Sequence, residues 1–106
     1  MGGGGRSGRG TSAGGKNRSI PKKVYQMIQH IKEKNGAPPP GYKGGKVYRN
    51  KPIKNGQKLP DGVNYREYDV NPYSKGTDRG AERIVIGDNG SAWYTDNHYE
   101  TFTRVD

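Results

Sequence analysis

The second half of the chain holds a glutamate, two arginines and a histidine that could work together chemically. Glu67 lies in the run NYREYDV, Arg79 and Arg83 are four residues apart in DRGAER, and His98 begins the run HYETF. A carboxylate and an imidazole can act as general base and general acid, and two guanidiniums can bind the oxygens of a phosphate. This combination suits cleavage of a phosphodiester by an internal hydroxyl, the reaction that the 2′-hydroxyl of RNA undergoes.

Taken one at a time, these residues have more common structural roles. A glutamate within a strand is most often a solvated outward residue, a pair of arginines is most often surface charge, and a lone histidine is most often structural. Their joint use in catalysis depends on the elements that would position them.

The first of those elements is a helix. Hydrophobic side chains recur at the i, i+3, i+4 and i+7 spacing of an amphipathic helix, at Val24, Met27, Ile28 and Ile31. We expect the helix to run from about 20 to 34, with Ser19 as a possible cap and Pro21 in its first turn. Asn35 and Gly36 predict a left-handed exit from it.

Short strand-like runs separated by turn residues follow the helix, at 46–48, 64–70, 82–86, 92–95 and 99–105. The Pro-rich and Gly-rich stretch 36–46 before them is predicted to be an irregular surface connection. One helix followed by an antiparallel meander predicts an α+β fold, with one N-terminal helix packed on a twisted antiparallel β-sheet.

Composition limits the organisation to one domain of 106 residues with a loose appendage. Residues 1–18 are mostly Gly, Ser and basic residues, so we expect a disordered linker there and a folded domain over 19–106. There is no cysteine, which excludes disulfides and thiolate zinc sites. No apolar run approaches the roughly 20 residues that cross a bilayer, and the first segment lacks the hydrophobic centre of a signal peptide, so we expect no membrane contact.

The chain carries a net charge of +9, which attracts polyanions such as RNA, DNA and acidic membranes. Residues 19–60 contain ten Lys or Arg and one acid, whereas residues 61–106 contain nine acids and five bases. The basic half is predicted to bind an anionic partner, although the same charge could serve only solubility.

The C-terminal half, about residues 46–106, resembles the barnase-like microbial ribonucleases, a family often called guanyl-specific ribonucleases. NHYETFTRVD resembles the closing strand of that family, with Asn97 where the family usually has Asp. YREYDV resembles the strand that carries the catalytic glutamate, and TDRGAERIVIG resembles the segment that places two arginines on the scissile phosphate.

This resemblance implies an endoribonuclease that cleaves single-stranded RNA to a 2′,3′-cyclic phosphate and then hydrolyses that product, with no metal and no cofactor. It implies Glu67 as general base, His98 as general acid, and Arg79 and Arg83 as the groups that hold the phosphate. Tyr99 would be an accessory phosphate contact.

The segment KVYRNKPIKNGQKLP resembles the base-recognition loop of the family. The resemblance implies that Tyr48 stacks on the base and that Arg49 and Asn50 belong to the loop around it. Lys51 and Pro52 stand where the family has Arg and Glu, so the carboxylate that reads guanine is missing. No Asp or Glu occurs between positions 33 and 61, and the loss of that acceptor should relax base choice.

The resemblance also implies a secreted enzyme or a toxin delivered into target cells, acting as a monomer and held in check by a barstar-like acidic inhibitor. Two alternatives stay open at this point. The chain could be an RNA-binding module without catalytic activity on the same fold, or a metal-dependent nuclease.

Overall fold

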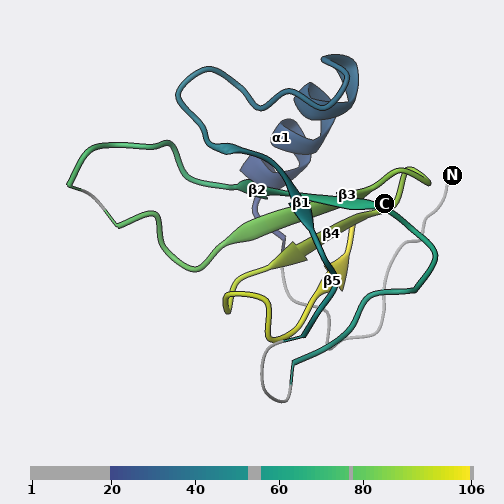
Figure 1. The fold of residues 1–106 in the computed structure, drawn as a ribbon. Helices are drawn as coiled ribbons and strands as arrows, with labels where there is room; N and C mark the ends of the chain where they lie inside the picture. Colours follow the sequence, from purple (N-terminus) through teal and green to yellow (C-terminus); the bar gives the residue numbers. More distant parts are fainter. Residues whose placement is uncertain (1–19, 53–55, 77, 106) are drawn as a thin grey trace, which may run out of the picture.

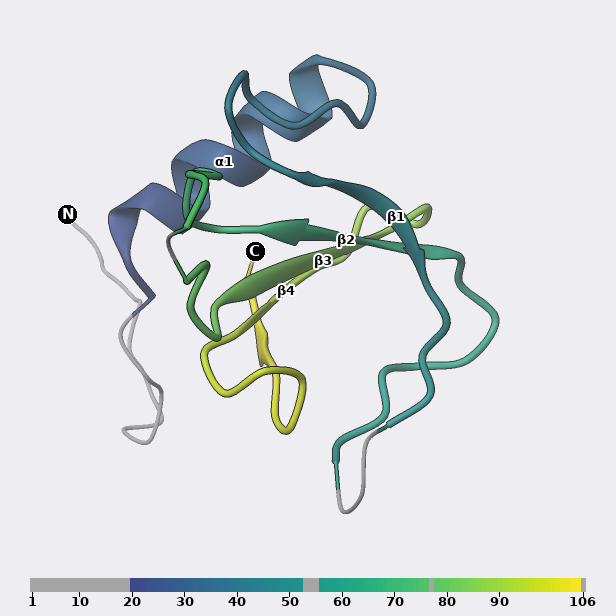
Figure 2. The same cartoon turned by 60° about the vertical axis from the view of Figure 1, so that its left-hand side comes forward.

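The computed structural model describes residues 20–52, 56–76 and 78–105. Helix α1 (Lys22–Glu33) is followed by strands β1 (Gly44–Tyr48), β2 (Tyr65–Asp69), β3 (Arg83–Gly87), β4 (Ala92–Thr95) and β5 (Thr103–Arg104). The helix lies across one face of a twisted antiparallel sheet, which confirms the predicted α+β class (Figures 1 and 2). The predicted linker at 1–18 and the predicted cap at 19 lie outside the described residues.

Helix α1 is slightly shorter than the predicted span of 20–34. Pro21 stands at its N-cap with φ −58° and ψ 143°, so the prediction that this proline lies within the first turn is wrong, because its ψ is extended. The predicted left-handed exit is confirmed, with φ values of 55° at Asn35 and 97° at Gly36. The Gly36 N–H donates to the carbonyl of Ile31 at 2.8 Å. No helix within the described residues is long and apolar enough to span a membrane.

The apolar stripe of α1 packs on the sheet and forms the larger hydrophobic core. The buried members of this core are Val24, Met27, Ile28, Ile31, Tyr68, Val70, Ile84, Ala92, Tyr94 and Val105. Burial of this apolar surface is the main force that holds the helix on the sheet.

The five strands follow chain order across the sheet, and each pairs antiparallel with the next. Side chains alternate between the two faces of a strand, so Tyr68 points toward α1 while Glu67 and Asp69 point to the opposite face. A second core covers part of that opposite face, built from Leu59, Tyr65, Val85 and Phe102, with Tyr48, Val63, Trp93 and Tyr99 packed against it. The rest of this face is open.

Strand β1 begins at Gly44, two residues earlier than predicted and inside the stretch that we expected to be irregular. A side chain at Gly44 would meet the ring of Tyr68 at 2.4 Å, so the close pairing of β1 with β2 requires glycine there. The ladder is irregular between Gly44 and Lys46, and Gly45 has φ 96°. This bulge places Lys46 directly opposite Glu67.

The predicted last strand at 99–105 is wrong over most of its length. Strand β5 covers only Thr103–Arg104, and His98 and Tyr99 lie in a turn with φ values of 57° and 75°. Positive φ is incompatible with an extended strand, so the histidine sits on a loop rather than at the start of a strand.

Candidate active site

A cavity of about 610 Å³ opens on the sheet beyond the second core. Glu67, Arg79, Arg83, His98 and Tyr99 all line it. These are the five residues to which the family resemblance gives catalytic or phosphate-binding roles, and the fold brings all of them to one place. The cavity is of a size that holds small ligands.

Strands β2 and β3 position the centre of this site. Glu67 and Asp69 are two residues apart on β2 and therefore share a face. Asp69 pairs across the ladder with Arg83 on β3. Two neighbouring strands of the sheet thus fix the positions of Glu67 and Arg83 relative to each other.

Asp69 links the two arginines, and the sequence interpretation did not single it out. Its Oδ1 lies 3.1 Å from Arg83 Nε, and its Oδ2 accepts a hydrogen bond from Arg79 Nη1 at 3.0 Å. The side chains of Asp69 and Arg83 are only 7% and 6% exposed, whereas that of Arg79 is 46% exposed. Arg83 also donates to the carbonyls of Gly80 and Glu82 at 2.9 and 2.7 Å. One buried carboxylate therefore orients both guanidiniums toward the cavity.

His98 and Tyr99 both take the left-handed conformation, which costs on the order of 1–3 kcal/mol for a residue with a side chain. The surroundings hold this turn in place. The His98 N–H donates to the carbonyl of Ala81 at 3.1 Å, and the Tyr99 N–H donates to Thr95 Oγ1 at 3.1 Å. His98 in this turn lines the cavity.

Asn97 organises the loop that carries His98. Its Oδ1 accepts from the hydroxyl of Thr95 at 2.9 Å and from the N–H of Thr101 at 3.0 Å. Its Nδ2 donates to Thr101 Oγ1 at 2.8 Å. An aspartate could accept from the Thr101 hydroxyl instead, so the loop suits Asn97 as well as the Asp that the family usually has.

Tyr99 covers Glu67. The Tyr99 hydroxyl donates a short hydrogen bond to Glu67 Oε1, and its ring stacks on Tyr48 with centroids 5.4 Å apart and planes 14° apart. Burial, together with the hydrogen bond and charge of Glu67, holds the pKa of Tyr99 well above its ordinary range. Burial and the charge of Glu67 also raise the pKa of Tyr48. Both phenols therefore stay neutral at pH 7.

The three residues predicted to recognise the base lie next to the cavity rather than in its wall. Tyr48 is half-buried under Tyr99, and Arg49 is exposed. Asn50 has φ 56°, and its side-chain amide bonds both the N–H and the carbonyl of Leu59 at 2.8 Å. The Asn50 side chain thus closes the loop. Residues 53–55 of the same loop lie outside the described residues.

Sequence reasoning missed three charged residues of the cavity wall, namely Lys43, Lys46 and Asp69. Asp69 carried a usable signal, because it lies two positions after Glu67 and so on the same face of the strand. The two lysines carried none, because they fall in or at the end of a stretch without a periodic pattern. Within the described residues, no group of three or more His, Asp or Glu could hold a metal ion.

A second cavity, of about 560 Å³, lies on the helix side of the sheet, and its walls include Ile31, Val47, Tyr68 and Ile86. None of the candidate catalytic residues lines it. Of these two cavities, the one around Glu67 is therefore the candidate active site.

Known proteins share both the sequence and the fold. Residues 6–106 match the ribonuclease family. Guanyl-specific ribonuclease St of Saccharopolyspora erythraea is 40% identical over 81 residues, which cover 74% of this chain and 70% of that protein.

Two solved structures of ribonuclease Sa2 superpose on the chain with a TM-score of 0.50. One holds guanosine-2′-cyclophosphate and is 25% identical, and the other belongs to a set of complexes with mononucleotides and is 28% identical. Each match covers 82% of this chain. It covers 88% of the ribonuclease Sa2 chain in the first structure and 85% in the second. We conclude that this chain belongs to the barnase-like, guanyl-specific microbial ribonucleases, which are endoribonucleases that need no metal ion.

Proposed function

We propose that the chain cleaves single-stranded RNA by internal transesterification, with Glu67 as general base and His98 as general acid. Glu67 takes the proton of the ribose 2′-hydroxyl, the 2′-oxygen attacks phosphorus, and the bond from phosphorus to the 5′-oxygen breaks. His98 gives its proton to the departing 5′-oxygen, which leaves a 2′,3′-cyclic phosphate.

The cyclic phosphate is then hydrolysed with the roles reversed. His98 accepts a proton from the attacking water, and Glu67 returns its proton to the departing 2′-oxygen, so the product ends in a 3′-phosphate. Arg79 and Arg83 stabilise the additional negative charge on phosphorus in both steps. Tyr99 moves from Glu67 to the substrate and donates its hydroxyl hydrogen bond to the phosphate.

The observation that carries this proposal is the convergence of Glu67, Arg79, Arg83 and His98 on one cavity. The buried Asp69 supports it, because fixed guanidiniums stabilise a transition state without having to reorganise. A surface that only bound RNA would need positive charge but no buried group to orient it.

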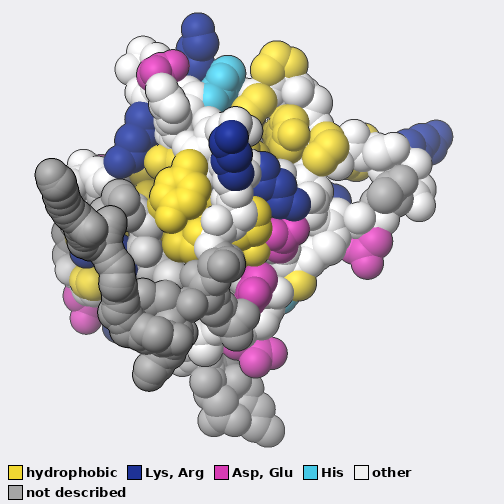
Figure 3. Space-filling view, turned by 180° about the vertical axis from the view of Figure 1, so that it is seen from behind, with side chains coloured by type: hydrophobic (Ala, Val, Ile, Leu, Met, Phe, Trp, Pro, Cys, Tyr) yellow, Lys and Arg dark blue, Asp and Glu magenta, His cyan; other side chains and the backbone are white. Residues whose placement is uncertain are grey.

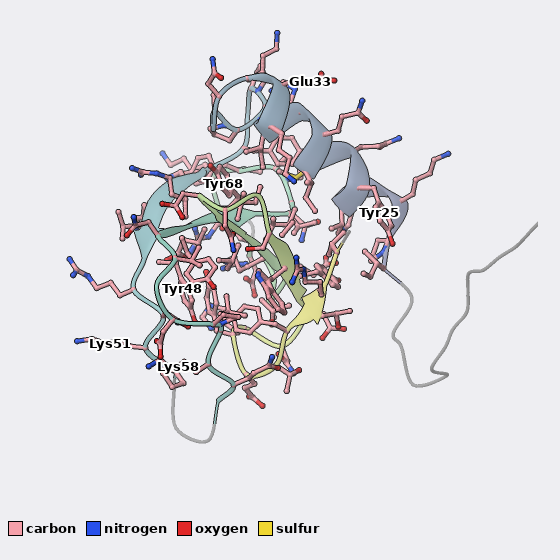
Figure 4. All side chains as sticks on the ribbon, turned by 90° about the vertical axis from the view of Figure 1, so that its right-hand side faces the viewer. Tyr25, Glu33, Tyr48, Lys51, Lys58 and Tyr68 are labelled. Carbon is pink, nitrogen blue, oxygen red and sulfur yellow. The ribbon has the colours of Figure 1, made fainter. Side chains whose placement is uncertain are left out.

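The decisive experiment measures cleavage of a defined single-stranded RNA in the presence of a chelator. Glu67→Ala and His98→Ala should still bind RNA but cut it at least about a hundredfold more slowly. Glu33→Ala and His30→Ala are matched controls on α1 and should cut at the wild-type rate, since neither residue lines the cavity. Figure 4 shows Glu33 on the helix. Full activity in Glu67→Ala would overturn the assignment, and loss of activity with chelator would indicate a metal-dependent reaction.

We further propose that base preference is relaxed, because no carboxylate occurs between positions 33 and 61 to accept from guanine. Mapping of fragment ends tests this, with cuts expected after every base type. Cuts only after guanine would contradict it. Pro52→Glu restores a carboxylate where the family has one, and it should raise the preference for guanine by roughly tenfold.

We propose that the biological role is that of a secreted or delivered antibacterial toxin, acting as a monomer and controlled by a barstar-like acidic inhibitor. The net charge of +9 supports an acidic partner as well as RNA. From behind, many basic side chains are seen on the upper part of the molecule and most of the visible acidic ones lie lower (Figure 3).

Expression inside bacterial cells tests this role. The wild-type chain should arrest growth, Glu67→Ala should not, and an acidic inhibitor should restore growth by forming a one-to-one complex. Unimpaired growth with the active enzyme would contradict a toxin role while leaving the chemistry intact.

A further inference from the structure

An exposed tyrosine and a lysine lie together at the edge of the active-site cavity. The Nζ of Lys43 is 4.1 Å from the centroid of the Tyr73 ring. Lys43 also lines the cavity that contains the catalytic candidates. Tyr73 is 49% exposed, and it is not part of either hydrophobic core of the described residues. A flat ring open to solvent next to a cation is the combination that binds nucleotides.

Backbone hydrogen bonds hold this pair in a set position. The Tyr73 N–H donates to the carbonyl of Gly41 at 2.7 Å, and the Asp69 N–H donates to the carbonyl of Lys43 at 2.9 Å. Asp69 is the residue whose carboxylate orients the two arginines. The Lys43–Tyr73 pair is therefore anchored to the same residue as the guanidiniums that face the phosphate.

The charges at this edge favour an additional anion. Glu67 and Asp69 line the cavity but are engaged, Glu67 by the Tyr99 hydroxyl and Asp69 by the arginines. Lys46 also lines the cavity, directly opposite Glu67 in the ladder. Among the ion pairs within the described residues, none includes Lys43 or Lys46. Two exposed lysines, Lys43 just before β1 and Lys46 within it, therefore add positive charge beyond the groups needed for the scissile phosphate.

We propose that Lys43, Lys46 and Tyr73 form a subsite for the nucleotide next to the scissile one, a proposal that rests on RNA being the substrate. The ammonium groups hold the neighbouring phosphate, and the ring of Tyr73 stacks on the neighbouring base. Single-stranded RNA allows this because its bases can turn outward and stack on aromatic side chains. Stacking accepts any base, so the subsite should favour longer substrates without reading their sequence.

The experiment compares kcat/KM for a dinucleotide with kcat/KM for trinucleotides extended by one residue on the 5′ side or on the 3′ side. In the wild-type enzyme, one extension should raise kcat/KM by about tenfold. Tyr73→Ala and Lys43→Gln should lose most of that gain, chiefly through KM. Tyr73→Ala should cut the dinucleotide as the wild type does, because Tyr73 does not line the cavity of the catalytic candidates. Tyr73→Phe should keep the gain, because it keeps the ring.

Salt dependence provides a second readout. Lys43→Gln removes one phosphate contact, so its plot of log kcat/KM for the favoured trinucleotide against log salt should be less steep by roughly 0.7. Tyr73→Ala should leave that slope unchanged. A lysine that only supports the tyrosine ring would not change the slope.

Two control variants remove a tyrosine ring and a lysine charge elsewhere in the molecule. Tyr25→Ala removes an exposed tyrosine of α1, and Lys32→Gln removes a lysine that donates to the carbonyl of Gly90. Figure 4 shows Tyr25 on the helix, on the other side of the sheet from Tyr48. Both variants should keep the wild-type gain with substrate length.

Failure of this inference and failure of the proposed function give different results. If neither extension raises kcat/KM, or if Tyr73→Ala keeps the whole gain, the subsite is wrong while the cleavage chemistry stands. If no substrate is cut, the proposed function fails. Binding of 2′-deoxy di- and trinucleotides then still tests the subsite, since Tyr73→Ala must remove the advantage of the longer one.

Discussion

At the scale of single residues, Asp69 links the two arginines that we propose hold the phosphate. Its carboxylate is buried, its two oxygens contact Arg83 and Arg79 respectively, and it lies two residues after Glu67, the proposed general base, on the same strand. Arg83 is as buried as Asp69, so the two charges depend on each other for their stability. Asp69 and Arg83 therefore form a buried pair within the candidate site.

Asp69→Asn should therefore reduce both stability and activity. Removing one partner of a buried ion pair costs about 3 kcal/mol of unfolding free energy, because Arg83 stays buried without a counter-ion. The freed guanidiniums should lower kcat/KM by about a hundredfold, since a small misplacement near the reacting phosphate is enough to do so. Urea unfolding and initial rates on RNA measure the two effects.

Asp61→Asn is the matched control, because Asp61 pairs with Lys58 at 3.0 Å on the surface. It should change stability by less than about 1 kcal/mol and leave activity unchanged. If Asp69→Asn were as active per folded molecule as the wild type, Asp69 would have only a structural role.

At the scale of elements, Glu82 ties the helix to the sheet next to the arginine segment. It accepts hydrogen bonds from Lys23 on α1 at 3.1 Å, from the Tyr94 hydroxyl on β4 at 2.6 Å and from Asn71 at 3.3 Å. Burial alone would raise the pKa of Glu82, but these hydrogen bonds and the charge of Lys23 outweigh it and lower the pKa below its ordinary 4.5.

A lowered pKa makes the contribution of Glu82 to stability depend on pH. The folded state favours the ionised form, so the contribution is complete above pH 4.5 and is lost as the pH falls below that value. Glu82→Gln should cost about 1 kcal/mol at pH 7 and much less at pH 3. Unfolding free energies of both proteins at the two pH values measure this.

Glu33→Gln is the control for that pH series. Glu33 is exposed on α1 and accepts only a bond from Gln29 at 3.2 Å within the described residues, so its substitution should change stability little at either pH. An equal cost of Glu82→Gln at pH 7 and pH 3 would mean that packing, not ionisation, explains the role of Glu82.

At the scale of the whole molecule, positive charge is concentrated in the first part of the chain and brings RNA to a site built mainly by the second part. Residues 1–18 contribute four Lys or Arg to this field. Long-range attraction of this kind raises association rates and weakens as salt screens it.

Removal of residues 2–18 should therefore affect association more than folding. The net charge falls from +9 to +5, and kcat/KM on long RNA at low salt should fall by about threefold. The melting temperature and kcat should stay unchanged, and at 0.5 M salt the two proteins should be equally active. A large loss of melting temperature would show that the segment belongs to the folded domain.

The sequence alone determined the helix, the three central strands and the identity of the main candidate groups, but not the extent of β1 and β5. The apolar stripe of α1, its left-handed exit at Asn35 and Gly36, and strands β2 to β4 all follow from periodicity and turn residues, which act over a few positions. Glu67, Arg79, Arg83 and His98 were found through short motifs in a set order. The cavity brings these four together, while their catalytic roles remain predictions.

The tertiary structure decided how those groups are held. The bridge from Asp69 to Arg79, the stacking of Tyr99 on Tyr48 and the meeting of Lys43 with Tyr73 all join residues at least ten positions apart. The same is true of the turn at His98, where a bond to Ala81 helps to hold a backbone conformation that local preference disfavours. Such contacts leave no periodic trace in the sequence, because they depend on which strands become neighbours.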